Sequence, residues 1–198
     1  MERLENLIAV TGGIGSGKSV VCRILGAKGY NVYDCDSRAR RLMESDPGIK
    51  ERLCTEITPA AVTPDGLLAR KAIADVVFDS PEKLARLNAI VHGAVLSDIV
   101  RWYGVHAREG LPLFVETAIL YQSGLDRMVT EVWEVTAPDE VRIRRAVLRD
   151  SAPAEAIEAR IRSQRVQPEH PHENVHLIVN DDVTPVLPAV NALLACRR

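Results

Sequence analysis

Short apolar runs along the chain alternate with stretches in which apolar residues recur at helical spacing. Residues 7–10 (LIAV) form a run typical of a buried strand, and further strands are predicted at 30–33, 113–117, 131–136 and 176–179. Helical patterns separate these runs, and strands that alternate with helices favour a parallel sheet covered on both faces. The pattern therefore predicts a three-layer α/β/α fold with a five-stranded parallel sheet.

A glycine-rich segment connects the first predicted strand to the helix that follows it. Residues 12–19 read GGIGSGKS, which matches the phosphate-binding pattern G-x-x-x-x-G-K-[ST]. Glycines let backbone N–H groups approach phosphate oxygens, and the positive end of the following helix favours the same anion. Lys18 is predicted to reach the β- and γ-phosphates, and the Ser19 hydroxyl to bind Mg²⁺. The nucleoside triphosphate site is predicted to comprise Gly13, Ile14, Gly15, Ser16, Gly17, Lys18, Ser19 and Val20.

Two carboxylates follow the second predicted strand, in the sequence Asp34-Cys35-Asp36. If the strand alternation continues, both project from one side at the carboxyl end of the strand, where open α/β sheets bind ligands. Beside a phosphate site, such a pair could organise a metal ion or act as a general base. The alternative is that Asp36 or Ser37 caps the next helix.

Residues 37–110 carry helical patterns and no obvious strand. One of these helices is predicted to begin at Ser80-Pro81-Glu82, where Ser can cap a helix and Pro suits its first turn. The whole stretch is too long for an ordinary connection between two strands. We therefore expect a helical lobe at about 37–110 that holds a second substrate.

The helix predicted after Pro138 is rich in arginine. Arg142, Arg145 and Arg149 lie on one helical face, and a second basic helix is predicted over 154–165. In a phosphate-binding protein, two such helices predict a lid, at about 142–173, that closes over the phosphates and excludes water. The alternative is a charged face that only contacts solvent.

The composition limits the number of domains and the choice of partners. The chain has 198 residues, 46% of them hydrophobic, which suits one domain over 1–198. We expect its nucleotide-binding core to comprise about 1–36, 111–141 and 174–198. The net charge of -2 argues against nucleic acid or an anionic membrane as a partner.

The start of the chain runs directly into the first predicted strand, so we expect no targeting segment. No apolar run approaches the roughly 20 residues of a membrane helix. Scattered cysteines without a C-x-x-C pair are typical of small core residues in a reducing compartment; they are Cys22, Cys35, Cys54 and Cys196. We expect a cytoplasmic protein that is a monomer or a weak homo-oligomer and acts on a small molecule.

A phosphate loop alone does not separate kinases from GTPases or motor ATPases. The sequence has no N-K-x-D motif to read guanine and no D-x-x-G switch, and Glu116 follows Val115 where a standard Walker B motif has aspartate. Together with the early Asp pair, the helical insertion and the arginine-rich lid, these features favour a small-molecule kinase. The acceptor is open at this point.

The chain resembles the dephospho-CoA kinase family over nearly its whole length. Residues 11–19 (TGGIGSGKS) are similar to that family's phosphate loop, and residues 32–36 (VYDCD) resemble its V-I-D-A-D element. Residues 120–125 (LYQSGL) stand where the family has L-F-E-x-G-L. Further matching positions are Thr136-Ala137-Pro138, Arg145, Arg149-Asp150, Ala159-Arg160-Ile161, Gln164 and Asn180.

The resemblance implies a P-loop kinase fold and ATP- and Mg²⁺-dependent phosphorylation of the ribose 3′-hydroxyl of dephospho-CoA. It implies that Asp36 is the general base, and that Asp34 or Glu116 assists through metal-bound water. Arg145 and Arg149 would clamp phosphates or stack on adenine when the lid closes. The helical lobe would hold the pantetheine arm, with His92 as a contact.

The chain also departs from the family pattern. His92 is followed by Gly93 where the family has His-Pro, and Gln122 replaces an acidic residue. Two other functions therefore stay open: a small-molecule kinase with another acceptor, and a nucleotide-binding regulatory protein without transfer activity.

Overall fold

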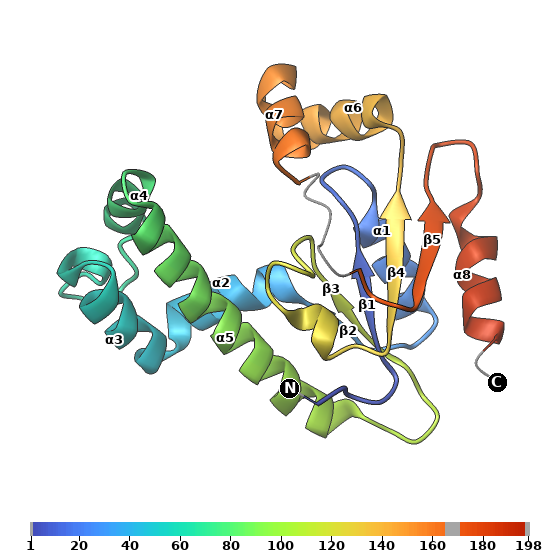
Figure 1. Ribbon diagram of the computed structural model, residues 1–198, viewed down its shortest axis with the longest axis horizontal. Helices are drawn as coiled ribbons and strands as arrows, with labels where there is room; N and C mark the ends of the chain where they lie inside the picture. Colours follow the sequence, from blue (N-terminus) through green and yellow to red (C-terminus); the bar gives the residue numbers. More distant parts are fainter. Residues whose placement is uncertain (1, 165–170, 197–198) are drawn as a thin grey trace. The chain divides into compact units, whose positions relative to one another are not determined.

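The computed structural model describes residues 2–164 and 171–196. The chain divides into two compact units. The first comprises Met1–Tyr33 and His106–Arg198 and contains the sheet drawn in Figure 1; the second comprises Asp34–Val105 and is helical.

A parallel sheet forms the centre of the first unit. In the part of the chain that the structure describes, it has five strands in the order β2-β3-β1-β4-β5. β1 pairs in parallel with β3 and β4, and β4 pairs in parallel with β5. The predicted α/β fold with a five-stranded parallel sheet is confirmed. The strands are β1 (Leu7–Thr11), β2 (Val32–Asp34), β3 (Leu113–Glu116), β4 (Glu131–Thr136) and β5 (Val175–Val179).

The central strand β1 is buried on both faces of the sheet, because apolar residues occupy both sets of alternating positions along it. Ile8 and Val10 belong to a core that includes Val21 of α1 (Lys18–Ala27) and Val190 of α8 (Val186–Ala195). Leu7 and Ala9 alternate with them along the strand and have no exposed surface either. This packing fixes the strand and the helix on either side of the glycine-rich segment.

Two helices with a small core of their own follow β4. They are α6 (Asp139–Asp150) and α7 (Ala154–Gln164), and the predicted extension of α7 to Arg165 lies outside the described residues. Ala146, Ile157 and Ile161 are buried together, and the side chain of Ile14 packs against them. The apolar residue of the glycine-rich segment therefore ties that segment to α6 and α7.

The helical character predicted for residues 37–110 is confirmed. Ser80 caps the longest helix as expected, since its Oγ accepts from the backbone N–H of Lys83 at 3.3 Å. Asp98 is 7% exposed and pairs with Arg38 at 2.7 Å and with Arg101 at 3.3 Å. The helices of this unit are α2 (Cys35–Ser45), α3 (Pro47–Glu56), η1 (Pro59–Ala61), α4 (Arg70–Phe78) and α5 (Pro81–His106).

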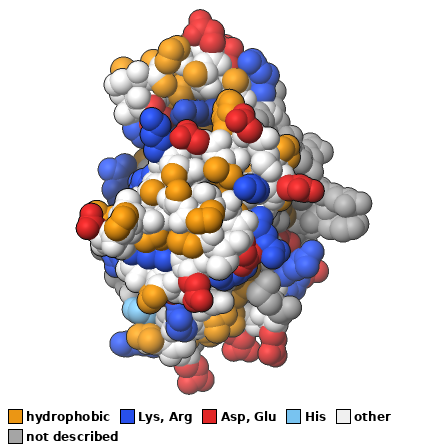
Figure 2. Space-filling model, turned by 90° about the vertical axis from the view of Figure 1, so that its left-hand side faces the viewer, with side chains coloured by type: hydrophobic (Ala, Val, Ile, Leu, Met, Phe, Trp, Pro, Cys, Tyr) orange, Lys and Arg blue, Asp and Glu red, His pale blue; other side chains and the backbone are white. Residues whose placement is uncertain are grey.

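The surface carries charges of both signs. On the face drawn in Figure 2, positive, negative and hydrophobic side chains are interspersed. Among the described residues, no helix is long and apolar enough to cross a membrane. All four cysteines are free, but the expectation that they are core residues is wrong for Cys196, which is exposed.

Candidate phosphate-binding site

The glycine-rich segment forms a tight loop between β1 and α1. Gly15 has a φ of 74° and Gly17 a φ of 95°, in the left-handed region that L side chains rarely adopt. A Cβ at Gly15 would lie 2.3 Å from the carbonyl oxygen of Arg142, and a Cβ at Gly17 would lie 2.0 Å from Nδ2 of Asn180. Glycine is therefore required at both positions by backbone conformation and by close approach.

Lys18 and Ser19 are the first two residues of α1. Nζ of Lys18 donates to the carbonyl oxygen of Gly12 at 2.9 Å, so the ammonium group lies against the loop. The amino-terminal end of α1 adds the positive end of a helix dipole at the same place. Among the described residues, the buried Oγ of Ser16 has no hydrogen-bond partner. The loop thus collects positive charge and polar groups suited to an anionic ligand.

Two arginines of α6 hold the loop through its carbonyl groups. Nε of Arg142 donates to the carbonyl oxygen of Ile14 at 2.9 Å. Nη1 of Arg145 donates to the carbonyl oxygens of Gly15 at 3.3 Å and Ser16 at 3.4 Å. Burial lowers the pKa of Arg142, but a guanidinium group stays protonated in proteins. This face of α6 therefore contacts the phosphate loop, in place of the alternative of a purely solvated surface.

Arg149 differs from the two other arginines predicted on this face. It pairs with its neighbour Asp150 at 2.7 Å, and its side chain is 65% exposed. The hydrogen bond from Arg149 lowers the pKa of Asp150. Arg160 of α7 approaches the same carboxylate at 3.7 Å. Arg149 thus pairs within α6 at the surface, and Asp150 connects this pair to Arg160 of α7.

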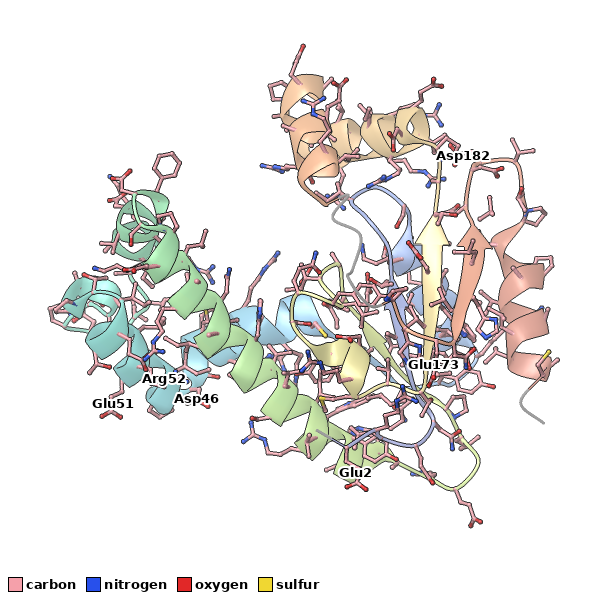
Figure 3. All side chains as sticks on the ribbon, viewed as in Figure 1. Glu2, Asp46, Glu51, Arg52, Glu173 and Asp182 are labelled. Carbon is pink, nitrogen blue, oxygen red and sulfur yellow. The ribbon has the colours of Figure 1, made fainter. Side chains whose placement is uncertain are left out.

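The structure adds two residues to the site, Asn180 and Asp182, to which the sequence analysis assigned no role. The side chain of Asn180, which follows β5, contacts both Ser16 and Arg145. Asp182 lies in the loop between β5 and α8, on the side of α6, as labelled in Figure 3, and accepts hydrogen bonds from Arg144 and Arg145. The bond from Arg145 lowers the pKa of Asp182. Asn180 appeared in the sequence analysis only as a position that matches the family pattern, without a role, and no pattern marks Asp182.

The expectation that strand alternation continues through Asp34-Cys35-Asp36 is wrong, because a helix begins directly after Asp34. β2 ends at Asp34 and α2 begins at Cys35, so Asp36 lies in the first turn of a helix. The carboxylate of Asp34 accepts from the backbone N–H of Ser37 at 3.1 Å and from its hydroxyl at 2.5 Å. Asp34 therefore makes the cap that was predicted for Asp36 or Ser37, and Asp36 is exposed.

The structure places the two other predicted site residues in different units. Glu116 ends β3 and is paired in register with Val10, two residues before the glycine-rich loop. Glu116 thus lies at the carboxyl end of its strand, level with the end of β1 where the glycine-rich loop begins. His92 lies on α5 of the helical unit, and partial burial lowers its pKa. Burial thus favours the neutral form of the imidazole.

Comparisons with known proteins identify the family of this chain. The family model described as dephospho-CoA kinase matches residues 6–185. A dephospho-CoA kinase from Bacteroides fragilis is 36% identical over 189 residues, covering 95% of this chain and 91% of that protein. One from Chlorobaculum tepidum is 37% identical over 191 residues, covering 92% and 89%. The crystal structure of a Thermus thermophilus protein has a TM-score of 0.76 and 32% identity, over 98% of both chains. The predicted resemblance is confirmed, and this chain belongs to the dephospho-CoA kinase family.

Proposed function

We propose that this protein transfers the γ-phosphoryl group of ATP to the ribose 3′-hydroxyl of dephospho-CoA, giving coenzyme A and ADP. The observation that carries the proposal is the loop between β1 and α1, whose glycines are held against Arg142 and Asn180 and whose Lys18 lies at the start of the helix. Membership of the dephospho-CoA kinase family supports the choice of acceptor.

Phosphoryl transfer requires positioning and neutralisation of charge more than covalent chemistry from the protein. The backbone N–H groups of residues 13–20 would surround the phosphates, and Lys18 would move from the carbonyl oxygen of Gly12 to the β- and γ-phosphates. This exchange replaces a neutral acceptor by a charged one, which makes the stronger hydrogen bond. The backbone N–H groups and Lys18 would therefore compensate the negative charge of the phosphates from several sides of the loop.

The residues at the loop also fit a magnesium ion. Mg²⁺ in kinases takes oxygen ligands, several of them from water and substrate phosphates, so that only one or two protein oxygens are needed. In the parts of the chain that the structure describes, no group of three His, Cys, Asp or Glu residues is placed to hold a metal alone. The Ser19 hydroxyl would be a direct ligand, and Glu116 would hold a metal-bound water. The ion would neutralise charge on the phosphates.

Asp36 is the proposed general base. Its carboxylate would accept the proton of the 3′-hydroxyl as that oxygen attacks the γ-phosphorus and the bond to the ADP oxygen breaks. The helix cap supports this role. Asp34 makes the cap hydrogen bonds, so the carboxylate of Asp36 is not used to cap the helix. Asp34 would then act on the reaction through the position of the helix that carries Asp36.

The remaining predicted residues belong to the lid and the helical lobe. We assign α6 and α7 to the lid, with Arg145 at the loop. Arg149, whose exposed side chain pairs with Asp150, would exchange that partner for phosphates or adenine when the lid closes. Closure would exclude water, which otherwise competes with the acceptor. The helical unit would hold the pantetheine arm, and the partly buried imidazole of His92 would be a contact there.

A coupled assay of ADP release, with and without dephospho-CoA and with the product identified by mass, tests the proposal. We expect acceptor-dependent ADP release and formation of coenzyme A. Lys18→Ala should lower kcat by roughly 10²–10³-fold because it removes a preorganised charge at the phosphates. Lys28→Ala, which removes an exposed lysine at the other end of α1, is the matched control and should keep normal activity.

Three outcomes would contradict parts of this proposal. Release of ADP only with a sugar or nucleoside acceptor would indicate another small-molecule kinase. Binding of ATP with no acceptor-dependent release would indicate a regulatory protein that has lost transfer activity. Normal turnover in Lys18→Ala would show that the loop between β1 and α1 is not the phosphate site.

A further inference from the structure

The side chain of Asn180 connects three segments that are distant in the sequence. Its backbone N–H donates to the carbonyl oxygen of Thr136 at 2.8 Å, which extends the pairing of β4 and β5 by one residue. Nδ2 donates to the carbonyl oxygen of Ser16 at 2.9 Å, and Oδ1 accepts from Nη2 of Arg145 at 3.2 Å. The residue is 8% exposed. The amide is thus held by a carbonyl group on one side and a guanidinium group on the other.

These two partners determine the orientation of the amide. A carbonyl oxygen requires a donor, and a guanidinium group has only donors and requires an acceptor. A reversed amide would set two acceptors against each other at Ser16 and two donors against each other at Arg145. Asn180 is therefore matched to its place by chemistry as well as by size, and neither Asp nor Leu has the same pair of groups.

The contacts of Asn180 and Arg145 hold the loop from its outer side. Both donate to the carbonyl oxygen of Ser16, and Arg145 also donates to that of Gly15. In a trans peptide the C=O and N–H groups point in opposite directions. Because the carbonyl group of Ser16 is directed at Asn180 and Arg145, the N–H group of Gly17 is directed away from them. The orientation of a loop amide is therefore set by side chains outside the loop.

Arg145 is itself held in place by Asp182. Asp182 accepts from both Arg144 and Arg145. The residue also has a φ of 69°, a conformation that costs free energy for a residue other than glycine. The pairing of Asp182 with both arginines fixes the guanidinium group of Arg145 beneath the loop and next to Asn180.

We infer that Asn180 is a positioning residue that sets the affinity of the phosphate loop for the polyphosphate of the nucleotide. Asn180 orients the Gly17 amide through the carbonyl group of Ser16 and contacts the loop from outside. Arg145 works with it as a second donor to the same carbonyl oxygen. This inference rests on the proposed function because it assigns the loop to nucleotide phosphates.

Asn180→Asp tests the inference with little change in size. The carboxylate can still accept from Arg145, but it cannot donate to the carbonyl oxygen of Ser16 and repels it. We expect the Kd for ADP, measured by calorimetry, and the KM for ATP to rise roughly tenfold, while the KM for dephospho-CoA stays unchanged. Asn191→Asp is the matched control, since it places the same new charge on the exposed side of α8 and should leave all three constants unchanged.

The split between the two substrates separates positioning from a general structural role. A variant that is only less well folded would show a lower Tm and a similar change in both KM values. If Asn180→Asp does not fold, Arg145→Lys provides the second test, because it keeps a cation beside Asp182 but loses the second donor to Ser16. It is expected to weaken ADP binding selectively in the same way.

The inference and the proposed function fail in different ways. Normal ADP affinity in a folded Asn180→Asp or Arg145→Lys protein would overturn the inference while leaving transfer to dephospho-CoA intact. Wild-type protein that binds ADP but does not phosphorylate dephospho-CoA would overturn the proposed acceptor. A selective loss of ADP affinity in Asn180→Asp would support the inference even then.

Discussion

Replacing glycine by alanine at two positions of the same helix region should have opposite effects on stability. Gly17 precedes the first residue of α1, with a φ of 95° and with the side chain of Asn180 against it. Gly26 lies inside α1, and a Cβ there would meet nothing within 4 Å. The pair Gly17→Ala and Gly26→Ala therefore compares an identical chemical change in two conformations.

The size of the effect follows from the structure. Alanine in a left-handed conformation costs about 1–2 kcal/mol. Its Cβ would lie 2.0 Å from Nδ2 of Asn180, so that side chain must move and lose its bond to Ser16, for about 0.5–1.5 kcal/mol more. The reduced freedom of the unfolded chain offsets about 0.4–1 kcal/mol. The net loss for Gly17→Ala is about 0.5–3 kcal/mol, whereas Gly26→Ala should gain about 0.5–1 kcal/mol.

Urea unfolding followed by tryptophan fluorescence measures both variants. Trp133 has no exposed surface, so its emission reports the loss of the core of the sheet. A shift of the urea midpoint at an unchanged slope reports a change in stability. Gly17→Ala should unfold at lower urea than wild type and Gly26→Ala at higher urea. A midpoint for Gly17→Ala at or above that of wild type would refute the reasoning, because it would mean that neither the strain nor the contact with Asn180 exists.

Two further predictions concern the carboxylates of α2 and the histidine of α5. Asp34→Ala should lower the free energy of unfolding by about 0.5–2 kcal/mol because it removes a helix cap, whereas Asp36→Asn should keep stability and lower kcat by roughly 10²–10⁴-fold. Urea unfolding and steady-state kinetics separate the two, and an equal loss of kcat and ATP affinity in Asp36→Asn would favour a structural or metal-binding role instead. Burial lowers the pKa of His92 in the folded protein, so below about pH 6.5 the unfolded chain takes up this proton first and stability falls as the pH falls. His92→Gln should lose less stability than wild type between pH 8 and pH 5.5, and an identical loss in both proteins would contradict the assignment.

The parts of the molecule that could be predicted are those specified by neighbouring residues. The buried run at 7–10, the glycine-rich loop and the cap at Ser80 each depend on fewer than ten consecutive residues, and the structure contains all three. The error at Asp34 and Asp36 arose at a boundary. A strand and a helix meet there without a connecting loop, so a shift of the boundary by one or two residues changes which carboxylate caps the helix.

The outer contacts of the phosphate loop could not be predicted in this way, because they join segments far apart in the chain. Asn180 and Ser16 are 164 positions apart, and Arg142 and Ile14 are 128 positions apart. The spacing within a motif indicates which backbone conformation the loop requires. It does not indicate which distant side chains contact the loop. At Gly17 the two requirements coincide, since the left-handed φ and the approach of Asn180 each exclude a side chain. The glycine at position 17 is usually explained by phosphate binding. Here the close contact with Asn180 on the outer side of the loop explains it in part.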